Sequence, residues 1–376
     1  VVMSWLVGVL LYVVVSVLLF LAGLVIDPGN AKPRSSLLGL KPVKRSLRGA
    51  KAQSLRVLTF NLRFMVDRYP ERRSFMLNTI MDADADVLGL QENALGVCLG
   101  THSSLQRHLK GADSARQYAY HPSRTASHAQ RVSYLAPLVN SVAFAPVLDG
   151  MYVFNRIFTP ERLFGRFVMK IFSHGFGRWV FCLTGAAWIF GNLIATPKGW
   201  RAVAHETIRL SNFRVAHRVL LVMPDNDARI WIVNTHLVDG RAHSAWKERV
   251  QQAKTLMAWV DEVSDVASGV VITGDFNGDP DEPVYSEFKK AGYTSAHTLA
   301  HGREPEYTFP SGIVAPAAET PDRTHVFDYI WLRGSIAVDL AAPDRGVRLV
   351  GDKPLPSDPT LYPSDHVGVC ADLLVT

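Results

Sequence analysis

The chain has 376 residues, of which 48% are hydrophobic and 20% charged, and its formal net charge is +6. This hydrophobic content excludes a largely disordered chain, and the length suits one large domain or two ordinary ones. The three cysteines are odd in number and far apart, which excludes a disulfide framework and a CxxC-type zinc site. The mild excess of basic residues is compatible with phosphate-bearing partners or an anionic membrane surface.

The first 26 residues carry no charged side chain, and about 20 apolar residues are enough to span a bilayer. They lack the basic start, short apolar core and cleavage site of a signal peptide, so we expect a transmembrane helix over residues 1–26. Residues 27–55 are rich in lysine and arginine and predict a juxtamembrane linker. The positive-inside rule then places the following domain on the cytoplasmic or matrix side, which agrees with a mitochondrial inner-membrane location among others.

From residue 56 short apolar runs alternate with amphipathic stretches, which is typical of an α/β domain. Strands are expected in RVLTFNLR, DVLGLQE, RIWIVNTHL, GVVITGDFN, FDYIWL and HVGVCADLLV. One helix is expected in PERRSFMLNTIMDADA, which opens with a proline. A second is expected in SAWKERVQQAKTLMAWVDEV, where one face carries Trp246, Val250, Ala253, Met257 and Val260.

Residues 144–187 interrupt this pattern with aromatic side chains interleaved with basic ones. The stretch WVFCLTGAAWIFGNLIAT is uncharged and long enough for a second membrane span. Glycines and Asn192 break it, and its second half also reads as a strand. We therefore favour an insertion that packs on the core, lies at a membrane surface or contacts protein partners of a membrane complex.

Polar side chains gather where the expected strands begin or end: Asn61, Glu92, Asn234, His236, Asp275, Asn277, Asp328, Asp365 and His366. Each of them alone is explained as a turn residue or a structural histidine. Together they supply carboxylates for a hard cation such as Mg²⁺, with Mn²⁺ as a substitute, and histidines and amides for a phosphate. Phosphodiester hydrolysis needs an activated water, charge stabilisation and help for the leaving oxygen, and this set covers all three.

The ordered motifs TFNLR, LQEN, NTHL, GDFNGDP, FDYIWL and PSDHVGV resemble the endonuclease/exonuclease/phosphatase superfamily, whose fold is called DNase I-like. The resemblance covers about residues 56–376. It implies a four-layer α/β sandwich of two mixed sheets flanked by helices, with the site at one end of the strands. With the N-terminal transmembrane helix, this chain would be a membrane-anchored member.

The resemblance also implies a metal site. Glu92 would be the principal Mg²⁺ ligand, with Asn61 beside it, and Asp365 would lie near the metal. Arg63 stands where some nucleases carry a second acidic residue.

The remaining residues would act on the phosphate. Asp275 would orient or deprotonate the attacking water, and Asn277 would hold the phosphate. Strand positions two apart point to the same side, so both can address one phosphate while Phe276 faces the core. The resemblance implies that His236 and His366 bracket the scissile phosphate. Asp328 would fix the tautomer and charge of His366. Asn192 and Asn234 are weaker candidates for phosphate contacts.

The motifs predict the reaction class and leave the substrate open. A membrane anchor and an aromatic insertion favour a lipid phosphoester, such as sphingomyelin or a phosphoinositide, over nucleic acid. Nucleic-acid binding would call for a basic groove, for which Arg201, Arg209, Arg214 and Arg218 are candidates. The alternative is a former hydrolase that serves as an accessory structural subunit of a membrane complex. It would be favoured if Glu92 lay too far from Asp275 and His366 to share one hydrogen-bond network.

Overall fold

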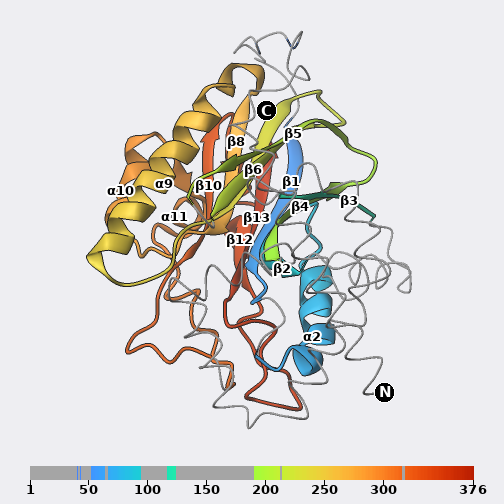
Figure 1. Ribbon diagram of the computed structural model, residues 1–376. Helices are drawn as coiled ribbons and strands as arrows, with labels where there is room; N and C mark the ends of the chain where they lie inside the picture. The colour runs from blue at the N-terminus through green and yellow to red at the C-terminus, as the bar shows by residue number, and fades with distance from the viewer. Residues whose placement is uncertain are drawn as a thin grey trace, which may run out of the picture.

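The structure is a computed structural model (Figure 1) that describes residues 40, 43, 52–63, 67–94, 117–123, 190–211, 214–315 and 318–376. The expected transmembrane helix and the insertion over residues 144–187 lie outside these ranges. Among the helices within them, none is long and apolar enough to cross a bilayer. The membrane anchor therefore stays a prediction.

Two mixed β-sheets form the centre of the molecule. The first has the order β11-β13-β1-β2-β4-β3, with β12 also paired to β13. Its strands are β1 (Gln53–Asn61), β2 (Val87–Ala94), β3 (Tyr118–Pro122), β4 (Phe190–Pro197), β11 (Ile336–Val338), β12 (Val347–Val350) and β13 (Gly368–Val375). The second, in the order β5-β6-β7-β8-β10-β9, contains β5 (Arg201–Arg209), β6 (Val215–Val222), β7 (Arg229–His236), β8 (Gly269–Asp275), β9 (Thr294–Ser295) and β10 (Asp328–Gly334).

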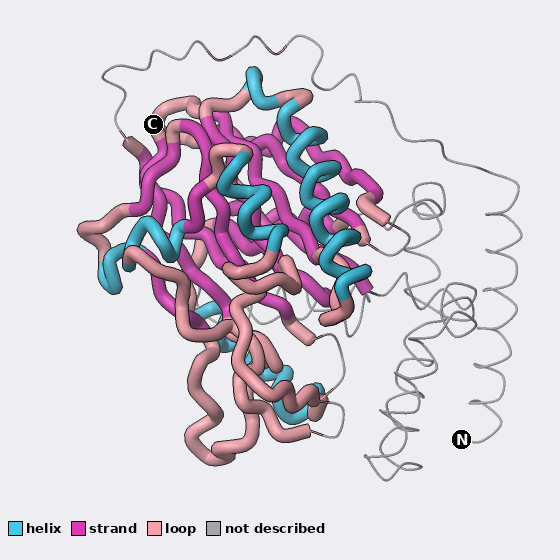
Figure 2. The backbone as a smooth tube through the Cα atoms, turned by 90° about the vertical axis from the view of Figure 1, so that its left-hand side faces the viewer, coloured by secondary structure: helices cyan, strands magenta, loops and turns pink. Residues whose placement is uncertain are grey.

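Helices cover the outer face of each sheet, which gives the expected four layers (Figures 1 and 2). α2 (Tyr69–Asp82) packs on the first sheet, and α9 (His243–Asp261) and α10 (Pro283–Lys290) pack on the second. The remaining helical segments are α11 (Ala296–His301) and the 3₁₀ turns η3 (Ser264–Val266) and η4 (Pro343–Gly346). β1 and β2 are parallel, as are β7 and β8, because α2 and α9 return the chain to the same end of the sheet.

Three hydrophobic clusters fill the spaces between the layers. The central one joins the facing sides of the two sheets and includes Val57, Ile194, Ile232 and Val271. Because β7 and β8 are covered on both faces, nearly all their residues are buried, which explains their continuous apolar sequences. Phe276 packs in the cluster beneath α9 and α10, so its expected direction towards the core is confirmed.

Two details of the expected layout change. β1 begins at Gln53, which pairs with Val375, so the folded domain starts before residue 56. The linker also touches the domain, because the backbone N–H of Val43 donates to the carbonyl of Asp265 and Leu40 packs beside the cluster under α9.

The buried face of α9 also differs from expectation. Trp246 and Val250 are only partly buried, whereas Arg249, Gln252 and Leu256 are fully covered. The Arg249 guanidinium pairs with Glu282 at 2.7 Å, and the Gln252 side chain accepts from the Val238 backbone N–H. Polar residues therefore occupy part of the buried face of α9, because their hydrogen-bond partners lie beneath that face.

Candidate active site

Asp275 lies at the meeting point of the two sheets. In the second sheet it pairs in register with His236 on β7 and with Asp328 on β10. From the first sheet, Asn61 donates its amide to the Asp275 carboxylate at 2.8 Å. The ends of β1, β7 and β8 thus coincide with the start of β10, which brings side chains from distant parts of the sequence to one point.

Glu92 reaches the same point through an irregularity in β2. The pairing of β2 with β4 shifts register between Leu90 and Asn93, and Glu92 has a left-handed backbone with φ 49°. A β-bulge re-aims a side chain at the edge of a sheet, and such strained residues concentrate at functional sites. As a result, the Glu92 carboxylate lies 3.4 Å from the Asn61 amide nitrogen, which also holds Asp275.

Asp365 and His366 arrive on the connection that precedes β13. Ser364 fixes this connection, because its buried hydroxyl donates to the Asn61 backbone carbonyl at 2.6 Å. The Nδ1 atom of His366 lies 2.9 Å from Asp328, and its Nε2 atom lies 3.7 Å from Asp275. The expected contact between Asp328 and His366 is therefore present in the structure.

The two histidines have different charge states. Burial opposes protonation of His366, but Asp328 and Asp275 outweigh it and raise the pKa of His366 to about 10. For His236, burial, together with Arg214 and His366, lowers the pKa well below its usual value. Burial also raises the pKa of Asp275 to about 7 despite the nearby His366. At neutral pH the site therefore combines a cationic His366, a neutral His236 and a carboxyl that can exchange a proton.

Within the described residues, no carboxylate holds the Nδ1 atom of His236. Its Nε2 atom lies 3.4 Å from Asp275, and its Nδ1 atom has no hydrogen-bond partner within the described part of the chain.

Two groups of side chains lie where a divalent cation could bind. Asp275, Asp328 and His366 lie close enough to share one ion, but a protonated His366 cannot be a ligand. Glu92 fits better, because the Asn61 amide at 3.4 Å is a weak partner that leaves the carboxylate oxygens available. An oxygen donor of this kind suits a hard cation.

Asn61 and Asp365, the other expected metal residues, differ in their contacts, because the Asp365 Oδ2 atom has no hydrogen-bond partner within the described residues. The Asn61 amide oxygen accepts from the Arg63 backbone N–H, while Asp365 lies 3.1 Å from the Arg63 guanidinium. Their ligation of a metal stays a prediction.

The three asparagines expected to bind phosphate differ in their position and in their hydrogen bonds. Asn277 follows β8 with a left-handed backbone (φ 51°) and donates its amide to the Leu237 carbonyl, so the chain turns there instead of continuing as a strand. Asn192 lies near the start of β4 and donates to the Val215 carbonyl. Asn234 is fully buried and donates to two backbone carbonyls while accepting from Gln91. Asn234 therefore ties the sheets together, and its contact with phosphate stays a prediction.

The sequence analysis did not assign a role to Asp279, whose carboxylate holds the segment that precedes Asp328. Its carboxylate binds His325 at 2.7 Å, Arg323 at 2.8 Å and the Val326 backbone N–H at 2.9 Å. These contacts fix the segment that delivers Asp328. The signal was available, since Asp279 belongs to the GDFNGDP motif.

The candidate basic groove does not assemble from all four arginines. Arg218 is buried, pairs with Glu206, and lies over the rings of Trp231 and Trp259. Arg201 and Arg209 are exposed on β5. Arg214 is the one of the four whose charge acts on both Glu92 and His236, and it pairs with Asp239 at 3.1 Å.

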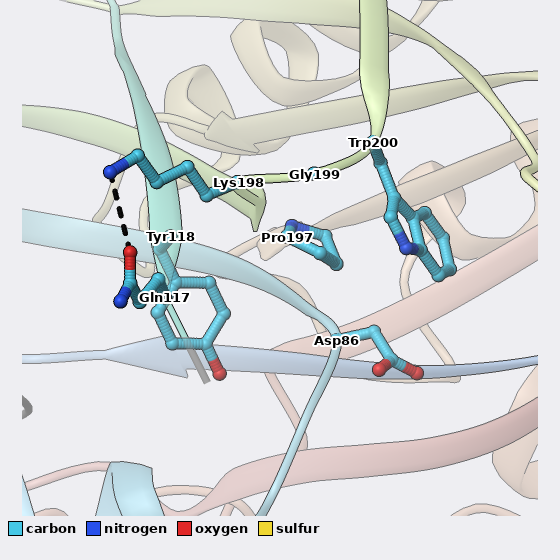
Figure 3. Close-up of a pocket in the computed structure, with 7 residues that line it drawn as sticks. All are labelled: Asp86, Gln117, Tyr118, Pro197, Lys198, Gly199 and Trp200. Atoms are coloured by element: carbon cyan, nitrogen blue, oxygen red, sulfur yellow. Dashed lines mark hydrogen bonds between the residues drawn. The ribbon is translucent and has the colours of Figure 1, made fainter. Parts of the chain in front are cut away.

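A separate pocket of about 500 Å³ is lined by Asp86, Gln117, Tyr118, Pro197, Lys198, Gly199 and Trp200 (Figure 3). Asp86 precedes β2, whereas Glu92 lies near its other end. Six residues of strand span roughly 20 Å. This pocket is therefore at the end of the strands opposite to the polar cluster and is not part of it.

Comparisons with known proteins agree with the fold. A model described as the Endonuclease/Exonuclease/phosphatase family matches residues 58–366. Nocturnin of Xenopus laevis is 31% identical over 150 residues, which cover 37% of this chain and 35% of nocturnin. The chain thus spans about a third of the length of that curated relative.

Two solved structures share the fold. The human Nocturnin catalytic domain with bound sulfate anion matches with a TM-score of 0.52 at 19% identity, over 87% of this chain and 96% of that one. D. rerio TDP2 complexed with single strand DNA product matches with a TM-score of 0.51 at 14% identity, over 85% of this chain and 99% of that one. Because the family model spans most of the described domain, the chain belongs to the endonuclease/exonuclease/phosphatase family, a family of phosphoester hydrolases that generally depend on a divalent metal.

Proposed function

We propose that this chain is a Mg²⁺-dependent phosphodiesterase that acts on nucleic acid. The observation that carries the proposal is the position of Asp275, which Asn61 links to Glu92 on one side and which lies beside both His236 and His366 on the other. Metal ligand, base and phosphate-binding groups therefore form one network.

The protein groups divide the work as follows. Asp275 takes a proton from the attacking water, because its raised pKa of about 7 suits a general base near neutral pH. His366 supplies a positive charge and a proton donor to the phosphate, and Asp328 holds its Nδ1 atom. Neutral His236 offers one hydrogen bond to the same phosphate. Asn277 lies next to the site, and its amide donates to the Leu237 carbonyl.

Glu92 would hold the Mg²⁺ ion, with Asn61 positioned between Glu92 and Asp275. When bound, the ion supplies charge stabilisation for the phosphate oxygens. Mn²⁺ has the same preference for oxygen ligands and serves as its substitute.

The choice of substrate rests on the similar proteins. One TDP2 structure carries a single-strand DNA product, and nocturnin of Xenopus laevis is among the curated relatives by sequence. These relatives favour nucleic acid and do not support the expected preference for a lipid phosphoester. A membrane anchor in residues 1–26 is compatible with either substrate and remains a separate proposal.

The position of Glu92 does not favour the alternative of an accessory structural subunit. A Glu92 that lay apart from Asp275 and His366 would have favoured it, and the Asn61 amide instead lies beside both the Glu92 and Asp275 carboxylates. A chain that had lost its chemistry would have no need to retain this arrangement.

The test is hydrolysis by the purified full chain in detergent, with single-stranded DNA, RNA and sphingomyelin vesicles supplied separately. Cleavage of an oligonucleotide that requires Mg²⁺ and is lost in Glu92→Gln and in His366→Ala supports the proposal. Cleavage of sphingomyelin alone would overturn the substrate class, and activity retained in both variants would overturn the site. The exposed Asp322→Asn variant serves as the control for a carboxylate lost elsewhere.

A further inference from the structure

Three histidines from both sheets point into the space between the sheets. His217 on β6 pairs with Asn234, whose side chain donates to carbonyls of the first sheet, and directly paired residues face the same side. His205 on β5 lies two residues before the partner of His217 and therefore shares this face. From the first sheet, His121 on β3 pairs with Ile194, a member of the central cluster. The register of the strands thus gathers three imidazoles from distant parts of the chain.

The three rings form a row with His205 in the middle. Its ring centroid lies 5.5 Å from that of His121 and 6.0 Å from that of His217, and both contacts are edge to face. Two imidazoles whose nitrogen atoms lie about 2.0–2.1 Å from one tetrahedral ion have centroids roughly 5 Å apart. The ring nitrogens do not all lie within 4.8 Å of one another, so the rings must turn to share an ion. His121 and His205 are only partly buried, which leaves room for this turn.

His217 is the deepest member of the row. It is fully buried, and its two ring nitrogens lie near the backbones of Asn234 and His121 without completing a hydrogen bond among the described residues. Burial, together with His205 and His121, lowers the pKa of His217 well below its usual value. At neutral pH this residue is therefore a neutral imidazole, which is the form that binds a metal.

A buried hydroxyl orients the outer member of the row. The Nε2 atom of His121 lies 3.1 Å from the Oγ1 atom of Thr196, which is fully buried on β4. A histidine that binds a metal through one ring nitrogen usually gives the other to an oxygen, which fixes the orientation of the ring. Thr196 would thus leave the Nδ1 atom of His121 for the ion. Neutral imidazoles suit Zn²⁺, whereas Mg²⁺ prefers oxygen ligands.

We propose that His121, His205 and His217 form a metal site, separate from the candidate active site, that binds Zn²⁺ and joins the edges of the two sheets. β3 and β5 are edge strands of the first and second sheets, and no backbone pairing joins them in the described part of the chain. An ion held by the three imidazoles would cross-link this edge of the sandwich. The inference goes beyond the proposed phosphodiesterase, because occupancy of this site requires no catalysis.

The experiment measures Zn²⁺ bound by the untagged full chain in detergent, by equilibrium dialysis in millimolar Mg²⁺. The chain carries Glu92→Gln and His366→Ala, which remove metal-binding side chains of the candidate active site. We expect one Zn²⁺ per chain on this background. His121→Gln and His205→Gln should each weaken its binding by roughly 100-fold or more, because each removes one ligand. Thr196→Val removes only the hydroxyl that orients His121 and should weaken binding about tenfold.

Thermal unfolding of the wild-type chain gives a second measurement. Free Zn²⁺ at roughly 100 times its dissociation constant should raise the unfolding temperature by about 5 °C relative to Zn²⁺-free buffer. This rise should be lost in His205→Gln. Because His121 and His205 are only partly buried, their glutamine variants are expected to fold, and unfolding in Zn²⁺-free buffer checks that they do.

His243→Gln is the matched control, because His243 is exposed at the start of α9, and its Zn²⁺ affinity should equal that of the background. A background chain that binds no Zn²⁺ would overturn the inference. Zn²⁺ whose affinity is unchanged in folded His121→Gln or His205→Gln would also overturn it, since the ion would then be bound without one of the three histidines.

Discussion

The Nδ1 atom of His366 lies 2.9 Å from a carboxylate oxygen of Asp328, although 38 residues separate them in the chain. Asp328 opens β10 directly opposite Asp275, so the same register that pairs the strands also aims the His366 Nε2 atom at Asp275, at 3.7 Å. The carboxylate of Asp328 therefore fixes both the orientation and the charge of the histidine.

Replacement of Asp328 by asparagine should lower kcat by about 10²–10⁴-fold, the usual contribution of general acid–base catalysis. Asp328 is one of the carboxylates that raise the pKa of His366 to about 10, and asparagine carries no charge. Activity that needs protonated His366 is lost as the pH rises through its pKa. In Asp328→Asn this loss should therefore move to lower pH, which a pH profile of kcat measures.

The exposed Asp322→Asn variant should keep the wild-type profile. An Asp328→Asn enzyme whose alkaline limb coincides with that of wild type would show that Asp328 does not control His366.

Arg72 should be among the side chains on which stability depends most. It is fully buried and donates to the carbonyls of Asp67, Leu62, Pro363 and Arg63. Arg72→Met keeps the apolar stem but leaves these carbonyls without a donor, and each unsatisfied buried group costs about 1–3 kcal/mol. We expect the free energy of unfolding in urea to fall by about 3 kcal/mol or more.

The control is Arg303→Met, since Arg303 is exposed and surface changes usually stay within about 0.5 kcal/mol. If Arg72→Met and Arg303→Met unfold at the same urea concentration, the carbonyl contacts of Arg72 do not stabilise the fold.

The sequence predicts the framework of the site because strand ends are local features. Asn61, His236 and Asp275 each follow an apolar run, and both faces of those strands are buried as their composition indicates. The parallel neighbours β7 and β8 bring His236 and Asp275 to one edge of the second sheet, and the packing of the two sheets adds Asn61.

Other parts of the site depend on features without a local sequence pattern. The register shift that aims Glu92 cannot be read from LQEN. The pairing of Arg63 with Asp365 joins residues about 300 positions apart. β5 and β6 were missed because histidine and arginine interrupt their apolar pattern. Arg218 is buried there between its partner Glu206 and the rings of Trp231 and Trp259.

His217 on β6 should make stability depend on pH. It is fully buried, and burial, together with His205 and His121, lowers its pKa well below the usual value. Below the unfolded-state pKa of about 6.5, the unfolded chain binds a proton that the native chain does not. The free energy of unfolding should therefore fall with decreasing pH, by about 1.4 kcal/mol per pH unit, until the native pKa is reached.

His217→Phe keeps an aromatic ring and removes the titration. Urea unfolding between pH 7 and pH 5 should show a shallower pH dependence in this variant than in wild type. Parallel curves would mean that His217 is protonated in the native state as readily as in the unfolded one.

Gly89 should be intolerant of any side chain, because it marks a close approach of the two sheets. A Cβ atom at Gly89 on β2 would lie 2.2 Å from the hydroxyl and 2.8 Å from the Cβ of Thr273 on β8. Gly89→Ala must push the sheets apart and should cost about 1–3 kcal/mol of unfolding free energy. It should also lower activity, since Glu92 lies three residues further along β2 and acts together with Asp275 on β8.

Gly199→Ala is the matched control, because a Cβ atom there meets nothing within 4 Å, and its unfolding free energy should equal or slightly exceed that of wild type. Adding Thr273→Ala to Gly89→Ala removes the nearest clashing atom and should restore part of the stability, although it also removes the hydrogen bond from Thr273 to the Val233 carbonyl. Equal losses in Gly89→Ala and Gly199→Ala would show that the contact with Thr273 is not the cause of the loss. A loss confined to Gly89→Ala would instead show that the sheet spacing under the active site is fixed by the absence of one carbon atom.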